Sequence, residues 1–182
     1  FSIGRINSIK DRVITVNGVS KGYAMTGWRV GFIGAPLWIA KACNKIQGQV
    51  TSATCAIAQK ATEEAMKADP KKTTSKMKET FLKRRDMMLT ELNTIKGVKC
   101  NVPDGAFYIF PDISYYFGKT DGKTTINNAN DLCMYLLHHC YVALVSGAPF
   151  GNPECVRISY AASDKMLNEA VKRIKFQLSK LY

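Results

Sequence analysis

Residues 17–31 read Asn-Gly-Val-Ser-Lys-Gly-Tyr-Ala-Met-Thr-Gly-Trp-Arg-Val-Gly, and this stretch decides how the rest of the chain is interpreted. Apolar runs flank it, with Arg-Val-Ile-Thr-Val at 12–16 and Val-Gly-Phe-Ile-Gly at 30–34. Such runs, bounded by polar or small residues, are typical of buried strands. The sequence therefore predicts two strands joined by a loop that carries one lysine and one arginine.

The loop combines two groups that suit pyridoxal phosphate. Lys21 stands among small and apolar residues, and a partly desolvated amine keeps its lone pair available for attack on a carbonyl. Arg29 is flanked by Gly27 and Gly31, which let a ligand approach closely, and its guanidinium offers forked donors to a phosphate. Ser20 adds a hydroxyl beside the lysine. A lysine and an arginine eight residues apart in a loop also occur by chance in most proteins, so from composition and spacing alone we favour a chance occurrence over a cofactor site.

Working outward, residue patterns predict a mixed α/β fold. Hydrophobic periodicity and helix-favouring composition predict helices at 37–47, 54–68, 73–96, 128–140 and 164–180. Short apolar runs predict strands at 98–102, 106–110, 142–145 and 155–160. Asp69-Pro70 and Gly97 are expected to end helices, and Ser163 to cap the last one. The part after about residue 75 resembles a compact domain, whereas residues 1–70 resemble an incomplete one.

Composition excludes several classes of protein. The chain has 182 residues, of which 46% are apolar and 22% charged, so it is neither disordered nor of low complexity. No apolar run approaches the ~20 residues of a membrane helix, and we expect no membrane partner. The chain begins at Phe1, so we expect a processed product or a piece of something longer.

The cysteines and histidines predict no metal site. The six cysteines form no C-x-x-C pair, and their even number without a secretory signal favours a reduced, intracellular protein. His138, His139 and Cys140 are adjacent, but consecutive helical residues diverge and cannot converge on one ion. Three other cysteines stand among apolar neighbours and are expected in the core: Cys43, Cys133 and Cys155.

The chain is strongly basic, with a net charge of +12. Nine lysines and arginines against three acids lie between Lys71 and Lys99. This surplus allows a helix that docks an acidic partner or nucleic acid. We favour a solvated helix face, because no aromatic residues interleave with the charges, and we expect no nucleic-acid partner.

Three motifs carry a resemblance to a known family. The first is Ser20-Lys21-x7-Arg29-x-Gly31 with Met-Thr-Gly-Trp at 25–28, and the second is Pro-x-Gly-Ala-Phe-Tyr at 103–108. The third is Val-x-Gly-x2-Phe-Gly at 145–151, followed by Val-Arg-Ile-Ser-Tyr-Ala at 156–161. Together they resemble the class I (fold-type I) pyridoxal-phosphate-dependent aminotransferases, in the aspartate aminotransferase and aspartate/prephenate aminotransferase branch. The resemblance covers essentially all 182 residues.

The resemblance implies a role for four residues. Lys21 would bind the cofactor as an imine and move a proton between the substrate α-carbon and the cofactor. Arg29, with help from Ser20, would bind the cofactor phosphate, and Arg157 would grip the substrate α-carboxylate. A surface arginine on a strand is the alternative for Arg157, weakened by apolar neighbours that look buried on the opposite face. For Tyr108 and Phe150 we favour core packing over a place in the site; the list of expected site residues is therefore Ser20, Lys21, Arg29 and Arg157.

The resemblance also implies the architecture: the C-terminal part of a pyridoxal-phosphate transferase fold. Residues 1–70 would be the C-terminal part of a large αβα cofactor domain, and 71–182 a small α/β domain. Family chains are about twice as long, and the preceding half supplies further cofactor contacts, including the partner of the pyridine nitrogen. We therefore expect residues 1–182 alone to be inactive.

The implied activity is exchange of an amino group between an amino acid, aspartate first, and a 2-oxo acid. Prephenate or aromatic amino-acid transfer is the alternative within the branch, and an inactive binding module with a basic helix is the alternative of another class. The family also implies a homodimer in its full-length form. We expect a cytoplasmic location, with an organelle as the alternative because any targeting peptide would precede Phe1.

Overall fold

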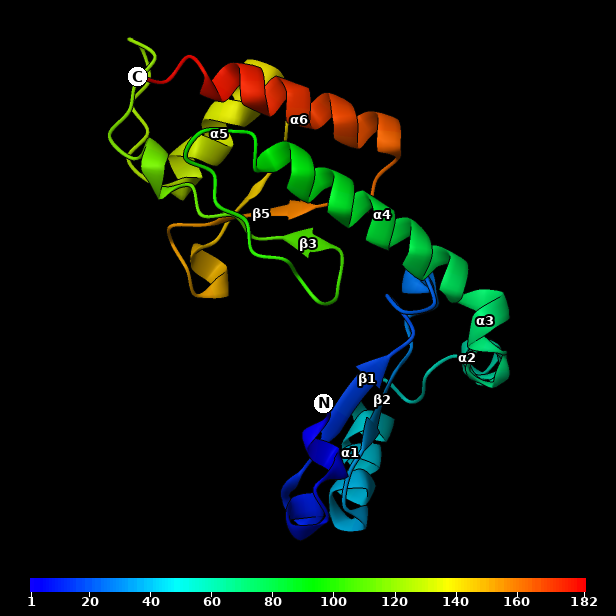
Figure 1. Ribbon diagram of the computed structural model, residues 1–182. Helices are drawn as coiled ribbons and strands as arrows, with labels where there is room; N and C mark the ends of the chain where they lie inside the picture. The colour runs from blue at the N-terminus through cyan, green and yellow to red at the C-terminus, as the bar shows by residue number, and fades with distance from the viewer. The chain divides into compact units, whose positions relative to one another are not determined.

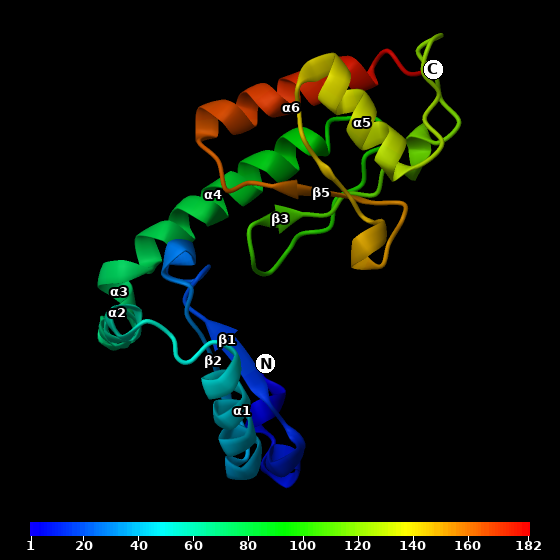
Figure 2. The same cartoon turned by 180° about the vertical axis from the view of Figure 1, so that it is seen from behind.

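The computed structural model describes residues 1–182 as two compact units, Phe1–Met77 and Lys78–Tyr182. Figures 1 and 2 show the chain from opposite sides. Both units combine helices with short strands, so the predicted α/β class is confirmed. None of the helices combines the length and the apolar character that a membrane-crossing helix needs.

In the first unit two strands pair antiparallel, with Thr15 opposite Gly34 and Gly18 opposite Gly31. The predicted strand at 12–16 is placed wrongly, because residues 7–12 form 3₁₀ turns and the strand starts at Thr15. The predicted burial is also wrong, because a two-stranded sheet leaves both faces largely open. The elements of this unit are β1 (Thr15–Gly18), β2 (Gly31–Gly34), α1 (Leu37–Val50), α2 (Ala56–Lys67) and α3 (Pro70–Thr73).

The core of the first unit is small. Val19, Val30 and Ala58 are its buried apolar residues. Helix α1 buries no residue at all, and Cys43 on it is exposed, which corrects the expectation that this cysteine packs in a core. The large apolar side chains that α1 exposes are Leu37, Trp38, Ile46 and Val50.

Local signals set the ends of the helices near the boundary of the units. Helix α2 ends at Lys67, and the Asp69 carboxylate then accepts a hydrogen bond of 2.9 Å from the Lys71 backbone N–H to cap α3. Helix α4 (Ser75–Leu92) is shorter than the helix predicted at 73–96, and the residues that follow Leu92 form turns instead. Gly97 lies beyond that end and has the positive φ of 82° that only glycine adopts without strain.

The second unit contains a three-stranded antiparallel sheet in the order β3-β5-β4. The predicted strand at 98–102 is reduced to a single bridge between Lys99 and Asp112. In Figures 1 and 2, α5, α6 and the C-terminal part of α4 lie on the same side of the strands. The other elements are β3 (Tyr108–Ile109), α5 (Ala129–Cys140), β4 (Val145–Ser146), β5 (Val156–Ser159) and α6 (Asp164–Leu178).

A single apolar core holds the second unit together. Side chains of α4, α5, α6 and the strands meet there, and the buried Cys133 and Cys155 confirm two of the three core cysteines. The Ser163 hydroxyl accepts a hydrogen bond of 3.3 Å from the Met166 backbone N–H, which confirms the predicted cap of α6. One buried polar side chain, Gln177, donates to the Tyr135 hydroxyl at 2.7 Å, so its burial is compensated.

Candidate functional site

The loop between β1 and β2 is closed at its base by two buried valines. Val19 and Val30 belong to the small core of the first unit, and the Val19 N–H donates to the Val30 carbonyl at 3.4 Å. Short-range bonds shape the rest of the loop, with the Tyr23 N–H donating to Val19 and the Ala24 N–H to Lys21. The loop that carries the predicted cofactor residues is therefore an ordered turn of backbone.

The structure places Ser20 and Lys21 at the start of this loop. Ser20 is half-buried, while the Lys21 side chain is exposed. The partial desolvation expected for Lys21 is therefore wrong for this chain, since the small and apolar loop residues do not cover its amine. The cofactor role of the lysine stays a prediction.

Arg29 ends the short 3₁₀ turn Thr26–Trp28 in a left-handed conformation, with φ of 54°. Its Nη1 donates to the Thr26 carbonyl at 2.8 Å, which fixes the orientation of the guanidinium. The guanidinium borders a cavity of about 740 Å³, whose wall also includes Gln47, Thr51 and Thr54. The Gln47 amide donates to the Thr51 hydroxyl, so the Arg29 guanidinium and the two threonine hydroxyls are the donors of this wall that suit an anionic group such as a phosphate. Neither Ser20 nor Lys21 lines this cavity.

Arg157 lies in β5, the central strand of the second unit's sheet. Val156 and Ile158 on either side of it are buried, at 1% and 6% exposure, and the alternation of the strand turns Arg157 to the other face. Its guanidinium carbon lies 4.5 Å from the centre of the Tyr108 ring and 4.3 Å from that of Phe150. No carboxylate of the chain forms an ion pair with it.

Tyr108 and Phe150 do not belong to the core, which corrects the preference for core packing. Tyr108 is half-buried and Phe150 is 48% exposed, and both rings contact the guanidinium of Arg157 instead. The pairing of β3 with β5 explains this contact, because Tyr108 lies opposite Ser159, two residues from Arg157 on the same strand. The sequence alone could not show the contact, because the register of the sheet is known only from the structure.

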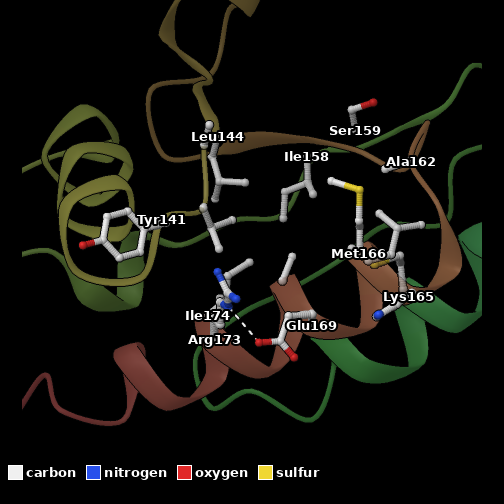
Figure 3. A pocket seen from close by; sticks show the side chains of 15 residues that line it. Tyr141, Leu144, Ile158, Ser159, Ala162, Lys165, Met166, Glu169, Arg173 and Ile174 are labelled. Carbon is white, nitrogen blue, oxygen red and sulfur yellow. Dashed lines mark hydrogen bonds and ion pairs between the residues drawn. The ribbon is translucent and has the colours of Figure 1, made fainter.

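A second cavity of about 560 Å³ lies between β5, the segment before β4, and α6 (Figure 3). Apolar side chains such as Leu144, Ile158 and Met166 form its wall. At its edge the Arg173 guanidinium pairs with the Glu169 carboxylate at 2.8 Å. Ile158 lines this cavity and Arg157 does not, so it is separate from the Arg157 site.

Other candidate chemistry is accounted for within the chain. No group of three or more metal-binding side chains occurs, and burial raises the pKa of the Cys133 thiol to about 11.

On the basic helix α4, Arg84 pairs with Asp164 at 2.7 Å, and Arg85 pairs with its neighbour Asp86. These arginines are neutralised inside the second unit, which weakens the case for a nucleic-acid surface.

Comparison with known proteins places the chain in a family. The family model for aminotransferase class I and II matches residues 4–174. A bifunctional aspartate aminotransferase and glutamate/aspartate-prephenate aminotransferase of Petunia hybrida is 46% identical over 177 residues, which are 96% of this chain and 37% of the relative. An aspartate/prephenate aminotransferase of Cereibacter sphaeroides is 45% identical over 166 residues, or 91% of this chain and 41% of the relative.

Solved structures agree with the sequence relatives. The crystal structure of an aspartate aminotransferase from Rhizobium meliloti matches 97% of this chain and 44% of its own, with a TM-score of 0.90 and 41% identity. An aromatic aminotransferase from Pyrococcus horikoshii matches 99% of this chain and 46% of its own, with a TM-score of 0.88 and 34% identity. The chain thus spans less than half the length of these relatives. With the family model matched over nearly its whole length, the chain belongs to the class I and II aminotransferases.

Proposed function

We propose that the protein carrying this sequence is a pyridoxal-phosphate-dependent aminotransferase that moves an amino group between aspartate and a 2-oxo acid. The observation that supports it best is Arg157, a half-buried guanidinium with two aromatic contacts and no carboxylate partner in the chain. A guanidinium in this state is suited to a carboxylate supplied by a ligand. Family membership makes an amino acid and a 2-oxo acid the expected carboxylate ligands.

Three residues of the first unit carry chemical groups that suit the parts of pyridoxal phosphate. The Arg29 guanidinium and the Ser20 hydroxyl are donors suited to its phosphate, and the primary amine of Lys21 is the kind of group that would bind its aldehyde. When bound, pyridoxal phosphate supplies an electron sink that stabilises negative charge at the substrate α-carbon. The Nζ atom of Lys21 would then move a proton between that α-carbon and the cofactor carbon that carries the aldehyde group.

Arg157 has an orienting role in this proposal. Its forked N–H groups bind both oxygens of the substrate α-carboxylate, which leaves the α-carbon with only limited rotation. The same contact accepts the 2-oxo acid, because the two substrates share the carboxylate. Arg157 therefore selects for α-carboxylates and does not distinguish one amino-acid side chain from another.

The assignment of domains is part of the proposal. We infer that residues 1–70 belong to a large cofactor domain and residues 71–182 form a small domain, in a protein that acts as a homodimer. The smallness of the first unit's core supports the first assignment, because three buried residues cannot sustain a domain by themselves. A cytoplasmic location remains our prediction.

Prephenate is a second candidate substrate, favoured by the similarity to relatives named for aspartate and prephenate. Both substrates carry a carboxylate that Arg157 can bind, so the described residues do not separate them. Steady-state rates of the full-length protein with aspartate paired with 2-oxoglutarate, and with glutamate paired with prephenate, decide between them.

Borohydride trapping tests the proposal directly. The full-length protein is incubated with pyridoxal phosphate, reduced and digested, and any pyridoxyl-lysine is located by mass spectrometry. Label confined to Lys21 is the expected result, and a Lys21→Arg variant should lose the label together with transaminase activity. Lys60, another exposed lysine of the first unit, gives a matched Lys60→Arg control that should keep both. Label scattered over surface lysines, with no transaminase activity, would overturn the proposal.

A further inference from the structure

An exposed phenylalanine lies on a turn of the second unit that several backbone hydrogen bonds close. Phe150 is 48% exposed, yet the turn that carries it is closed by backbone hydrogen bonds. The Phe150 N–H donates to the Gly147 carbonyl at 2.8 Å, and the Gly147 N–H donates to Cys155 at 2.8 Å. A Cβ at Gly147 would lie 2.4 Å from the Asn152 carbonyl oxygen, so the turn is as tight as glycine permits.

The Phe150 ring has a definite neighbourhood in spite of its exposure. Phe110 contacts it edge to face, with ring centres 6.4 Å apart and planes at 88°. On the other side the guanidinium of Arg157 lies 4.3 Å from the centre of the ring. An exposed aromatic ring gains little from burial, so its position is explained by these two contacts.

Tyr108, which lies on β3, has a similar set of neighbours. Its ring lies 4.5 Å from the Phe107 ring, centre to centre, and 4.5 Å from the guanidinium carbon of Arg157. Tyr108 and Phe150 form no ring contact with each other, so the guanidinium bridges them. Each of the two rings is thus steadied by a further phenylalanine and contacts the same cation.

We propose that Tyr108 and Phe150 are positioning residues that fix the guanidinium of Arg157 for a carboxylate ligand, and that the turn at 147–152 serves to present Phe150. Aromatic faces attract the cation without occupying its N–H donors, unlike a carboxylate partner, which would compete with the ligand. The arrangement restrains a long side chain that would otherwise lose rotamer freedom when the ligand binds. This inference rests on the proposed function of Arg157.

The first test needs no catalytic activity. In the chain 1–182 with labelled arginine, the Nε–H resonance of Arg157 should lie upfield, because the rings shield it. Phe150→Leu should move that resonance toward the position of an exposed arginine. Phe176→Leu is the matched control, because Phe176 is 65% exposed on α6 and its ring contacts Lys180 at 4.4 Å, away from Arg157. An Arg157 resonance that is unshifted in the native chain and unchanged by Phe150→Leu would overturn the proposal.

The second test uses the full-length protein and separates binding from chemistry. Removal of one ring should raise KM for the amino acid by about 2- to 30-fold, the range expected for one cation–π contact. The kcat should change far less, since the carboxylate contact exists in both ground and transition states. Tyr108→Phe, which keeps the ring, should retain the native KM, whereas Tyr108→Leu should not. A substrate amine without the α-carboxylate should react equally with native protein and Phe150→Leu.

The outcomes separate the two proposals. If the native protein has no transaminase activity, the proposed function fails, while the Arg157 resonance still reports on the ring contacts. If the native protein is active and Phe150→Leu leaves KM unchanged, the function stands and the positioning role is refuted. A drop in cofactor content or thermal stability equal in Phe150→Leu and Phe176→Leu would mark a merely structural effect and also refute the positioning role.

Discussion

Gly147→Ala should destabilise the second unit strongly. Among the glycines of that unit whose φ is not positive, Gly147 is the one where an added methyl group should cost most. The added Cβ would lie 2.4 Å from the Asn152 carbonyl oxygen and 2.5 Å from that of Cys155. Both are backbone atoms, so they cannot rotate away as a side chain could. The Gly147 N–H also donates to the Cys155 carbonyl at 2.8 Å, and the displaced backbone would break this bond.

The magnitude follows from these two effects. Overpacking costs about 1–3 kcal/mol, and a buried N–H that loses its partner costs about 1–3 kcal/mol more, which together give about 2–6 kcal/mol. Gly105→Ala is the matched control in the same unit, because a Cβ there has nothing within 4 Å. Its effect should stay within about 1 kcal/mol, since alanine in an open site mainly restricts the unfolded chain.

The assay is urea unfolding of residues 1–182, with amide hydrogen exchange read by mass spectrometry on peptides from Lys78–Tyr182. Peptide resolution is needed because a chain of two units need not unfold in a single transition. Gly147→Ala should lower the midpoint for peptides of β5 and α6, and Gly105→Ala should not. Equal midpoints for the two variants would refute the reasoning from the backbone contact.

Two further predictions concern the side chains of the native chain. Iodoacetamide at pH 8 should label the exposed Cys43 and Cys55 within the time that leaves Cys133 untouched, because burial both blocks that thiol and raises its pKa to about 11. Asp112→Asn should reduce the loss of unfolding free energy that the second unit undergoes at low pH. The reason is that hydrogen bonds from the Ser114 N–H and hydroxyl hold the Asp112 pKa below its ordinary value. The stabilisation is therefore present above a pH of about 4 and is lost as pH falls through the lowered pKa, so native protein should lose about 1 kcal/mol more than the variant between pH 6 and pH 2.

Each of these has a clear contrary result. Peptide mapping that finds Cys133 alkylated as fast as Cys43 would contradict the burial of the second unit's core. Parallel curves of unfolding free energy against pH for native protein and Asp112→Asn would show that the two hydrogen bonds do not couple to protonation.

The helices of this chain were predictable because their signals are local. Apolar spacing located α1, α5 and α6 to within a few residues, and the cap at Ser163 was predicted from the serine and the acid that follows it. The family and its fold were also predictable, because three sequence motifs occur in the order in which the family has them. These features depend on short stretches of sequence and so can be read without the tertiary structure.

The errors come from features that depend on what surrounds a residue. Apolar neighbours suggested a buried Cys43 and a desolvated Lys21, but the first unit has too few elements to cover either. From the sequence we favour core packing for Phe150, whereas its observed contact with Arg157 depends on sheet register and on the turn at 147–152. The roles proposed for Lys21 and Arg29 depend on a ligand and stay predictions.

The exposed apolar face of α1 should affect how the polypeptide folds and how long it persists in a cell. Trp38, Val50 and Ile46 are each more than 60% exposed, on a helix that contributes nothing to a core. Large exposed apolar patches are what chaperones recognise and what drives aggregation. Residues 1–182 made by themselves should therefore be bound by chaperones or degraded, and the yield of folded protein should be low.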